Sequence, residues 1–214
     1  MAVVKSKRPY SSRAREEQAA RTRDAALDAA ESLFLRHGYP GTSIASIARE
    51  AGVSVQTIYK VFGGKSGLVK AIYFRGLLGT GDDPAYERSD AMREREGDPR
   101  KIMRQWGVLT SEVASVVSPI RLLMRSAALA DPEIERLLKE TDRDRLERMR
   151  HHALFLKERG YLREGVTLEE ATDILWTCSS VEFYDLLVIQ RGWELPRFAG
   201  FLADYMITSL LSPE

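Results

Sequence analysis

The sequence predicts an all-α fold, with a small three-helix domain at the N-terminus and a larger helical domain behind it. Apolar residues recur at helical spacing from about residue 24 almost to the C-terminus, whereas β-branched runs are short and do not alternate as strands do. The charge is also divided along the chain. Residues 1–75 hold 13 Lys and Arg against 6 Asp and Glu, and residues 76–214 hold 19 against 25. A basic end joined to an acidic body indicates two domains with different tasks.

The predicted organisation has three parts. Residues 1–22 are polar and basic and show no apolar periodicity, so we expect a basic flexible arm there. A compact helical domain is expected over residues 23–75, and a larger helical domain over residues 76–214.

The first helix is expected to begin near Thr22 or Asp24, where apolar residues start to recur. It should end at Gly38, because a glycine can adopt the left-handed C-cap conformation and Pro40 blocks continuation of the helix. A fourth helix should follow from about Ser66.

Two short helices are expected between them, within the stretch TSIASIAREAGVSVQTIYKVFGGK at residues 42–65. Thr42 or Ser43 can cap the first of these helices. Gly52 then turns the chain, and Ser54 can cap the second helix. Two short helices joined by a tight turn that contains glycine have the architecture of a helix-turn-helix.

The second helix of this pair carries polar and aromatic side chains that contribute little to a core. From the end of a short helix, such groups can meet base edges in the major groove of DNA, and flanking hydroxyls and lysines can meet phosphates. The predicted DNA-binding residues are Thr42, Ser43, Gln56, Thr57, Tyr59, Lys60 and Lys65. Tyr59 has an alternative place, packed against the first helix, and exposure of Gln56 and Thr57 alone would not establish a base contact.

The stretch RDAALDAAESLFLRHGYPGTSIASIAREAGVSVQTIYKVFGGKSGLVKAIY, residues 23–73, resembles the DNA-binding domain of TetR-type transcriptional repressors. The resemblance rests on the spacing A…LF…GY.GTS…IA..AGVS…Y..F..K..L and on its N-terminal position. It implies an all-α homodimer, in which each subunit joins a three-helix DNA-binding domain to a larger domain with a small-molecule pocket and the dimer interface. The sequence departs from the family pattern at Lys60, where an aromatic residue or a histidine is common, and in FGGKSG after the second helix.

The basic arm leaves two interpretations open. It can enter a minor groove, as the arms of some DNA-binding domains do, or it can be a solvated tail that adds only weak electrostatic attraction. Its basic residues are Lys5, Lys7, Arg8, Arg13 and Arg15.

The larger domain begins behind a stretch at residues 79–99 that is rich in Gly, Pro and charge, which predicts a linker or loop with at most a helical turn. Beyond it the pattern is helical almost to the end. The predicted helices span about 100–117, 119–129, 132–159, 168–190 and 196–211.

The last two predicted helices, 168–190 and 196–211, resemble the penultimate and last helices of many TetR-type regulators and are apolar on more than one face. Such a helix must bury one face in its own domain and the other elsewhere. A homodimer that packs these helices in a two-fold four-helix arrangement would bury both faces. The alternative is a core within a single chain.

The larger domain also offers candidates for an adaptable apolar ligand pocket, although any single one of them suits plain core better. These pocket candidates are Met103, Trp106, Leu123, Met124, Phe155, Trp176, Phe183 and Tyr184. Among Arg104, Arg121 and Arg125, which lie between apolar residues, one could face inward and pair with an acidic ligand; surface exposure is the alternative.

Several classes of site are not expected. The one cysteine, Cys178, cannot form an internal disulfide and suits a buried position. His151 and His152 are adjacent, so on a helix they diverge by about 100° and do not form a metal-binding i, i+4 pair. With no catalytic motif, we expect no enzyme activity, no metal and no cofactor. No apolar run reaches about 18 residues and no secretory signal is evident, so we expect a cytoplasmic protein without a membrane partner.

The sequence therefore predicts a DNA-binding transcriptional regulator, specifically a repressor that leaves a palindromic DNA operator when a small, mostly apolar effector binds. The effector would have to bind the two conformations of the protein with different affinities. The alternatives are a regulator that needs no ligand and a regulator that activates, each with the same DNA-binding head.

Overall fold

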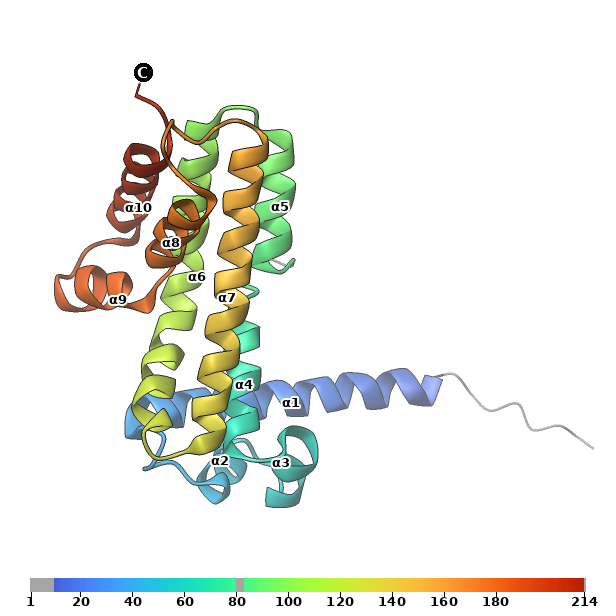
Figure 1. The fold of residues 1–214 in the computed structure, drawn as a ribbon. Helices are drawn as coiled ribbons and strands as arrows, with labels where there is room; N and C mark the ends of the chain where they lie inside the picture. Colours follow the sequence, from blue (N-terminus) through green and yellow to red (C-terminus); the bar gives the residue numbers. More distant parts are fainter. Residues whose placement is uncertain (1–9, 80–82, 214) are drawn as a thin grey trace, which may run out of the picture. The chain divides into compact units, whose positions relative to one another are not determined.

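The structure is a computed structural model that describes residues 10–79 and 83–213, with side chains from residue 13 onward. The chain divides into two compact units, Met1–Ile72 and Tyr73–Glu214. Helices make up both units, and the described residues contain no β-strand, only an isolated antiparallel bridge between Leu162 and Leu211 (Figure 1). The predicted all-α fold is confirmed.

The N-terminal unit holds helices α1 (Tyr10–His37), α2 (Ile44–Glu50) and α3 (Val55–Phe62), followed by α4 (Lys65–Gly76), which begins in this unit and ends in the next. Each of these four helices contributes buried apolar side chains. The most deeply buried of these side chains are Ala26, Leu27, Ala30, Phe34, Ile47, Ala48, Ile58, Leu68, Val69 and Ile72.

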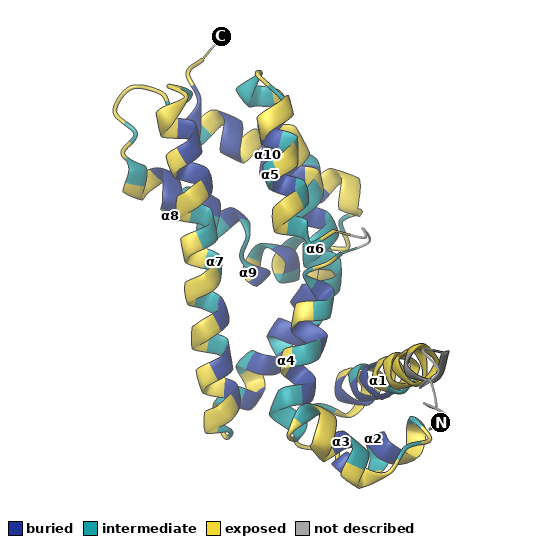
Figure 2. Cartoon of the chain, turned by 90° about the vertical axis from the view of Figure 1, so that its right-hand side faces the viewer, coloured by how far each residue is buried: buried dark blue, intermediate teal, exposed yellow. Residues whose placement is uncertain are grey.

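The first helix begins twelve or more residues earlier than predicted, at Tyr10 instead of near Thr22, so that the second half of the expected flexible arm is helical. The buried residues of α1 begin at Ala26, and the side chains of residues 13–25 are almost all exposed (Figure 2). Arg23 is partnered, because its guanidinium carbon lies 5.1 Å from the centroid of the Phe62 ring. Ala, Arg, Glu and Gln nevertheless have high helix propensity, and Arg13 Nε lies 3.1 Å from Glu17 Oε1, an i, i+4 ion pair.

Three basic residues of the predicted arm, Lys5, Lys7 and Arg8, lie outside the described residues.

The C-terminal unit is built around the long helices α6 (Pro99–Ala128) and α7 (Pro132–Glu158), which pack on each other. Helix α10 (Leu195–Leu210) packs along α6, and α8 (Leu168–Cys178) packs along α7. The short α9 (Val181–Tyr184) continues into a π-helical segment, η1 (Asp185–Gln190), and α5 (Ala85–Arg95) lies against α6 (Figure 1).

Three predicted boundaries in this unit are wrong. The expected linker at 79–99 contains the eleven-residue helix α5, whose polar composition hid it. The helices expected at 100–117 and 119–129 are one helix that runs through Pro119. Burial of Val117 and Ile120 on either side of this proline anchors the helix to the core, and this packing outweighs the cost of a proline in a helix interior.

The third wrong boundary concerns the single helix expected at 168–190. It is interrupted after Cys178, because Ser180 adopts an extended conformation with φ −77° and ψ 148° and starts a new helical turn. Serine hydroxyls compete for backbone hydrogen bonds and favour such helix ends: the Ser179 hydroxyl donates to the carbonyl of Trp176 at 3.0 Å.

Among the helices of the described residues, α6 alone is long and apolar enough to cross a membrane by length and composition, contrary to the expectation of no such stretch. Its apolar residues have another role here. Ile102, Met103 and Trp106 are buried in the core of the C-terminal unit, where α6 packs between α7 and α10. The core helix of a globular domain passes the same test of length and composition.

Candidate nucleic-acid interface

The turn between α2 and α3 is fixed by backbone and cap hydrogen bonds. Gly52 has a positive φ of 66°, which a glycine adopts without strain. Its N–H donates to Arg49 O at 3.3 Å and the N–H of Val53 donates to Ala48 O at 2.9 Å, which together form a Schellman motif. The Ser54 hydroxyl then accepts from the N–H of Thr57 at 3.1 Å and caps α3. The predicted cap and turn are confirmed.

Helix α3 separates its buried and exposed side chains sharply. Ile58 is completely buried and holds the helix against the N-terminal core, whereas Gln56, Tyr59 and Lys60 are exposed. Tyr59 is 54% exposed, which argues against the alternative in which it packs on the first helix. Tyr59 and Lys60 lie three and four residues after Gln56, so each of them shares the outer face of α3 with Gln56.

Thr57 is half-buried, and its hydroxyl lies 2.9 Å from the Ser54 hydroxyl within the cap of α3. Ser43 is exposed and caps α2: its hydroxyl accepts from the N–H of Ser46 at 3.0 Å, and the Ser46 hydroxyl accepts from the N–H of Ser43 at 3.2 Å. This reciprocal capping box leaves the Ser43 side chain at the surface beside the first turn of α2.

Thr42 is placed differently from the prediction. Its side chain is only 3% exposed, and its hydroxyl donates to Leu33 O at 3.1 Å and to Gly38 O at 2.9 Å. The hydroxyl thus ties the end of α1 to the start of α2 instead of pointing outward. The sequence shows a good capping residue at both positions 42 and 43, and only the fold distinguishes the buried threonine from the exposed cap.

Lys65 is half-buried at the start of α4. Its ammonium lies 4.1 Å from the centroid of the Tyr39 ring and donates to Tyr39 O at 2.5 Å. These two contacts hold the Lys65 ammonium beside the Tyr39 ring at the start of α4.

Sequence reasoning missed one candidate on the outer face of α3. Val55 is 36% exposed at the first position of the helix and is separated from Tyr59 by one helical turn. An apolar side chain at this place suits contact with the methyl group of thymine. The sequence signal for Val55 was its i, i+4 spacing to Tyr59, which places both residues on one helix face. A search for polar side chains alone overlooks Val55.

The predicted pocket residues lie mainly in the packed core of the C-terminal unit. Met103 and Met124 are completely buried, and Trp106, Phe155 and Tyr184 are also buried. The remaining three, Leu123, Trp176 and Phe183, are buried or half-buried in the same unit. Two hollows of about 440 and 420 Å³ lie elsewhere, and none of the eight predicted residues lines either of them.

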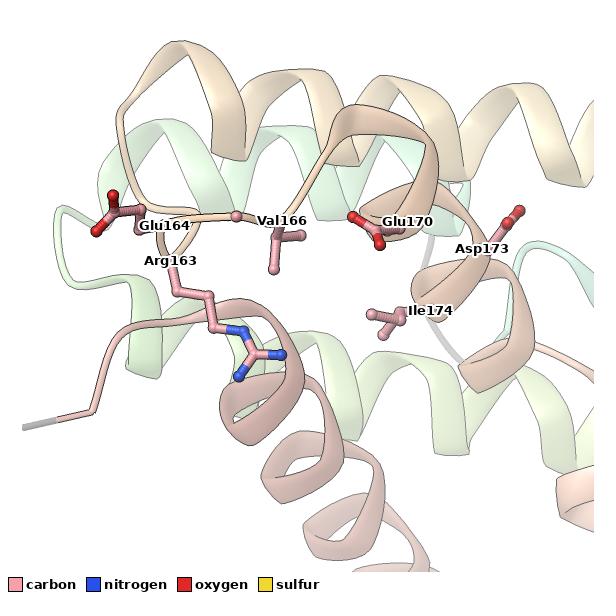
Figure 3. A pocket seen from close by; sticks show the side chains of 7 residues that line it. Arg163, Glu164, Val166, Glu170, Asp173 and Ile174 are labelled. Carbon is pink, nitrogen blue, oxygen red and sulfur yellow. The ribbon is translucent and has the colours of Figure 1, made fainter.

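The first hollow is polar and lies beside the loop that leads into α8. Its lining includes Arg163 and the carboxylates of Glu164, Glu170 and Asp173 (Figure 3). The Glu170 carboxylate already accepts from the N–H of Thr167 at 2.8 Å, as part of a capping box. The second hollow lies between α5 and α6 and includes Arg104 and the exposed Val108.

A buried polar cluster links α5 to α7. Arg93 is only 6% exposed. Its guanidinium donates to His151 Nε2 at 2.6 Å and lies 3.4 Å from His152 Nδ1. A guanidinium can only donate, so the contacted nitrogen of each histidine is the acceptor. Burial, followed by the charges of Arg148 and Arg93, holds the pKa of His152 well below its usual range. His152 is therefore a neutral structural residue that packs 4.4 Å from the Trp106 ring.

Cys178 is buried as expected, and this burial raises the pKa of its thiol to about 12. A thiol in this state is a weak nucleophile. Within residues 10–79 and 83–213, no group of three His, Cys, Asp or Glu side chains is arranged to hold a metal ion.

The fold and the exposed face of α3 define the class: an all-α protein with an N-terminal helix-turn-helix and a larger helical C-terminal domain. Residues 26–72 match the family described as bacterial regulatory proteins, tetR family. Residues 26–72 therefore resemble the N-terminal domain of this family.

Two curated relatives carry names of transcriptional regulators. The HTH-type transcriptional repressor ComR of Escherichia coli (strain K12) is 45% identical over 53 residues, 25% of each chain. The HTH-type transcriptional regulator BetI 1 of Chromohalobacter salexigens is 30% identical over 115 residues, 54% of this chain and 56% of the relative. The matched part of the chain therefore spans about a quarter and about half of these relatives.

Similar solved structures extend the likeness in fold to nearly the whole chain. The structure of a SmeT–triclosan complex is 22% identical with a TM-score of 0.68, and the match covers 89% of this chain and 92% of that one.

Proposed function

We propose that this chain is a transcriptional regulator that binds operator DNA as a homodimer and acts as a repressor. The observation that carries the proposal is the outer face of α3, where Gln56, Tyr59 and Lys60 are exposed on a helix that is capped and anchored by Ile58. Amide, phenol and ammonium groups on one helix face suit base edges and phosphates in a major groove. The excess of basic residues within 1–75 adds attraction to a polyanion.

The homodimer supplies the second recognition helix. Dimeric helix-turn-helix proteins bind half-sites about 34 Å apart, one turn of the double helix. The exposed apolar side chains of Leu186, Ile189 and Tyr205, in η1 and α10, support a subunit interface over 168–190 and 196–211, as expected from the sequence. A palindromic operator follows from the two-fold symmetry of such a dimer.

Release by a small, mostly apolar effector is the second part of the proposal. SmeT, which has a similar fold, has been solved in complex with the small molecule triclosan. An effector of this kind would act on the C-terminal unit and favour the conformation that leaves DNA. We place the protein in the cytoplasm, where its DNA would be.

A second candidate is a regulator that needs no ligand. It is favoured by the complete burial of Met103 and Met124, two of the predicted pocket residues, and by the position of both hollows away from the pocket candidates. Calorimetric titration with panels of apolar compounds separates the two candidates: saturable binding that weakens operator affinity supports the effector-controlled repressor, and the absence of any coupled binding supports the second candidate.

The DNA-binding proposal is tested by fluorescence anisotropy with the DNA upstream of the protein's own coding region. Gln56→Ala should weaken binding to the specific sequence by roughly 1–3 kcal/mol, the usual range for a base contact. As a matched control, Gln105→Ala removes the same side chain from an exposed position on α6, outside the proposed subunit interface. Equal affinity of both variants for specific and unrelated DNA would contradict the proposal.

A further inference from the structure

The C-terminal unit contains a second buried polar cluster. Of the residues predicted to contact DNA or line a pocket, only Trp176 belongs to it. It joins the end of α4 to α6, α7 and α8 through Tyr73, Arg121, Asp142, Arg145 and Trp176. Arg121 and Arg145 are both inside the protein, with side chains 5% and 14% exposed. Of the three arginines considered from sequence, Arg121 is the one that faces inward, whereas Arg104 is exposed.

The two guanidinium groups share one carboxylate. Arg121 donates to Asp142 Oδ1 at 2.5 Å, and Arg145 Nη2 lies 3.5 Å from the same oxygen. The other contacts of the pair are neutral: Arg121 donates to the Thr141 hydroxyl at 3.2 Å, and Arg145 to Trp176 O at 2.6 Å. The cluster therefore carries one positive charge more than its carboxylate balances. An excess charge in the interior is costly unless a counter-charge accompanies it.

Part of this excess is offset by the end of α8. Arg145 donates to Trp176 O and, at 2.8 Å, to the Ser179 hydroxyl, both at the C-terminal turn of α8, where the helix dipole favours a cation. This contact explains the position of Arg145, but half a charge from a dipole does not neutralise a full guanidinium. Consistently, burial and then the charge of Arg121 lower the pKa of Arg145.

Two hydrogen-bond donors in the cluster are left without acceptors. Nε of Arg145 and Nε1 of Trp176 are both buried and make no hydrogen bond. The guanidinium carbon of Arg145 lies 4.5 Å from the centroid of the Trp176 ring, so the stacking holds both donors within one small region. Buried donors of this kind are normally satisfied, and an anionic oxygen is the strongest acceptor for a guanidinium.

We propose that Arg121, Arg145 and Trp176 form the binding point for the carboxylate of an otherwise apolar small effector. The carboxylate balances the excess charge and accepts from the two unpaired donors, while the aromatic rings of Trp176 and Tyr73 contact the apolar part. This inference rests on the proposed function, because it names the chemical class of the effector.

The site also suggests how the effector acts on the protein. Tyr73 belongs to α4, a continuous helix that begins in the N-terminal unit, and the guanidinium carbon of Arg121 lies 5.8 Å from the centroid of its ring. A carboxylate that draws Arg121 away from Asp142 would alter this contact with α4. Differential contacts of this kind are what a ligand needs in order to shift an equilibrium between two conformations.

The test uses the full-length protein and two pairs of probes, hexanoate with hexanamide and benzoate with benzamide. Within each pair the shapes are similar and only the charge differs. Isothermal titration should detect the carboxylates and not the amides, at constant ionic strength. If the amides bind as tightly as the carboxylates, or if neither carboxylate binds, the proposal is overturned.

Two variants separate the site from general effects on folding. Arg145→Gln should weaken carboxylate binding about tenfold or more, the loss that one charge-assisted hydrogen bond represents. Asp142→Asn removes the competing carboxylate and should strengthen carboxylate binding, an effect that a destabilised fold cannot imitate. Unchanged or weaker binding by folded Asp142→Asn, with thermal unfolding to verify the fold, contradicts the proposal.

DNA binding without any carboxylate is measured separately, so the two proposals can fail independently. If the protein binds carboxylates but no DNA, the regulator proposal fails and the carboxylate site stands. If it binds DNA but its affinity for DNA is the same with and without saturating carboxylate, the assignment of this site to the effector is wrong.

Discussion

The hydroxyl of Thr42 donates to the carbonyl of Gly38 at 2.9 Å, and this bond lies inside the N-terminal unit, where the Thr42 side chain is only 3% exposed. Replacement by valine keeps the shape and leaves the carbonyls of Gly38 and Leu33 without this donor. Thr42→Val should therefore lower the free energy of unfolding by roughly 1–3 kcal/mol. Thr42→Ser, which keeps the hydroxyl, should lower it less, as measured by urea unfolding.

If Thr42 instead binds DNA through its hydroxyl, Thr42→Val would weaken DNA binding while the urea midpoint remained unchanged. That outcome would show that Thr42 contacts DNA directly, as the sequence predicted.

Lys60 should contribute to DNA binding mainly through charge. Lys60→Ala removes one phosphate neutralisation and should reduce the slope of log K against log salt by about 1, for specific and unrelated DNA alike. Lys157→Ala, which removes an exposed lysine from α7, is the matched control and should leave the slope unchanged. Equal slopes for Lys60→Ala and the wild-type protein would exclude a phosphate contact at this position.

Gly107 permits a close approach of α6 to α10. A Cβ at this position would lie 2.5 Å from Ala199 O and 3.1 Å from Ala203 Cβ. The 2.5 Å approach to a backbone oxygen is too short, so the two helices would have to move apart. Gly107→Ala should therefore destabilise the protein by about 1–3 kcal/mol in spite of the better helix propensity of alanine.

Gly200 provides the matched control, because it lies within α10 and a Cβ there would meet nothing within 4 Å. Gly200→Ala should stabilise the protein by about 0.5–1 kcal/mol. Thermal unfolding of both variants checks the pair, and a neutral or stabilising effect of Gly107→Ala would contradict the observed helix packing.

The stability of the C-terminal unit should fall in mild acid because of His152. Its pKa is lowered in the folded protein, so below the unfolded value of about 6.5 the unfolded chain binds more protons than the folded one. The stability that neutral His152 provides is thus complete above pH about 6.5 and decreases as the pH falls toward the lowered pKa. His152→Gln should flatten this part of the profile of unfolding midpoint against pH.

His37 is exposed at the end of α1 and serves as the control. His37→Gln should leave the acid dependence in place. The same loss of stability in wild-type protein and His152→Gln would assign the effect to other groups.

Apart from the start of α1, the N-terminal unit could be predicted closely from sequence because its signals are local. Ser43, Gly52 and Ser54 are each recognisable as a cap or a turn, and the structure places each of them in that role. The burial of Thr42 was not predicted, because threonine and serine are both good N-cap residues. Only the packing of α1 on α2 buries one of the two.

The C-terminal unit was less predictable because tertiary contacts decide its boundaries. The predicted helices 100–117 and 119–129 are separated next to Pro119, yet α6 continues through this residue. Conversely, the apolar run after Cys178 signalled one helix, yet the backbone turns at Ser180. The Arg121–Asp142 ion pair joins residues 21 positions apart on different helices, so no local spacing could identify which arginine is buried.

The central claim is that the outer face of α3 binds operator DNA in a dimer, and quantitative DNA binding tests it most directly. We would measure the affinity of wild-type protein and the double variant Gln56→Ala with Lys60→Ala for the DNA upstream of its own coding region, with molar mass determined by light scattering. The account predicts a dimer that binds this DNA at least about 10³ times more tightly than unrelated DNA, and a double variant that remains dimeric but loses this preference. A folded dimer that binds both DNAs equally, or a double variant with unchanged preference, would contradict it.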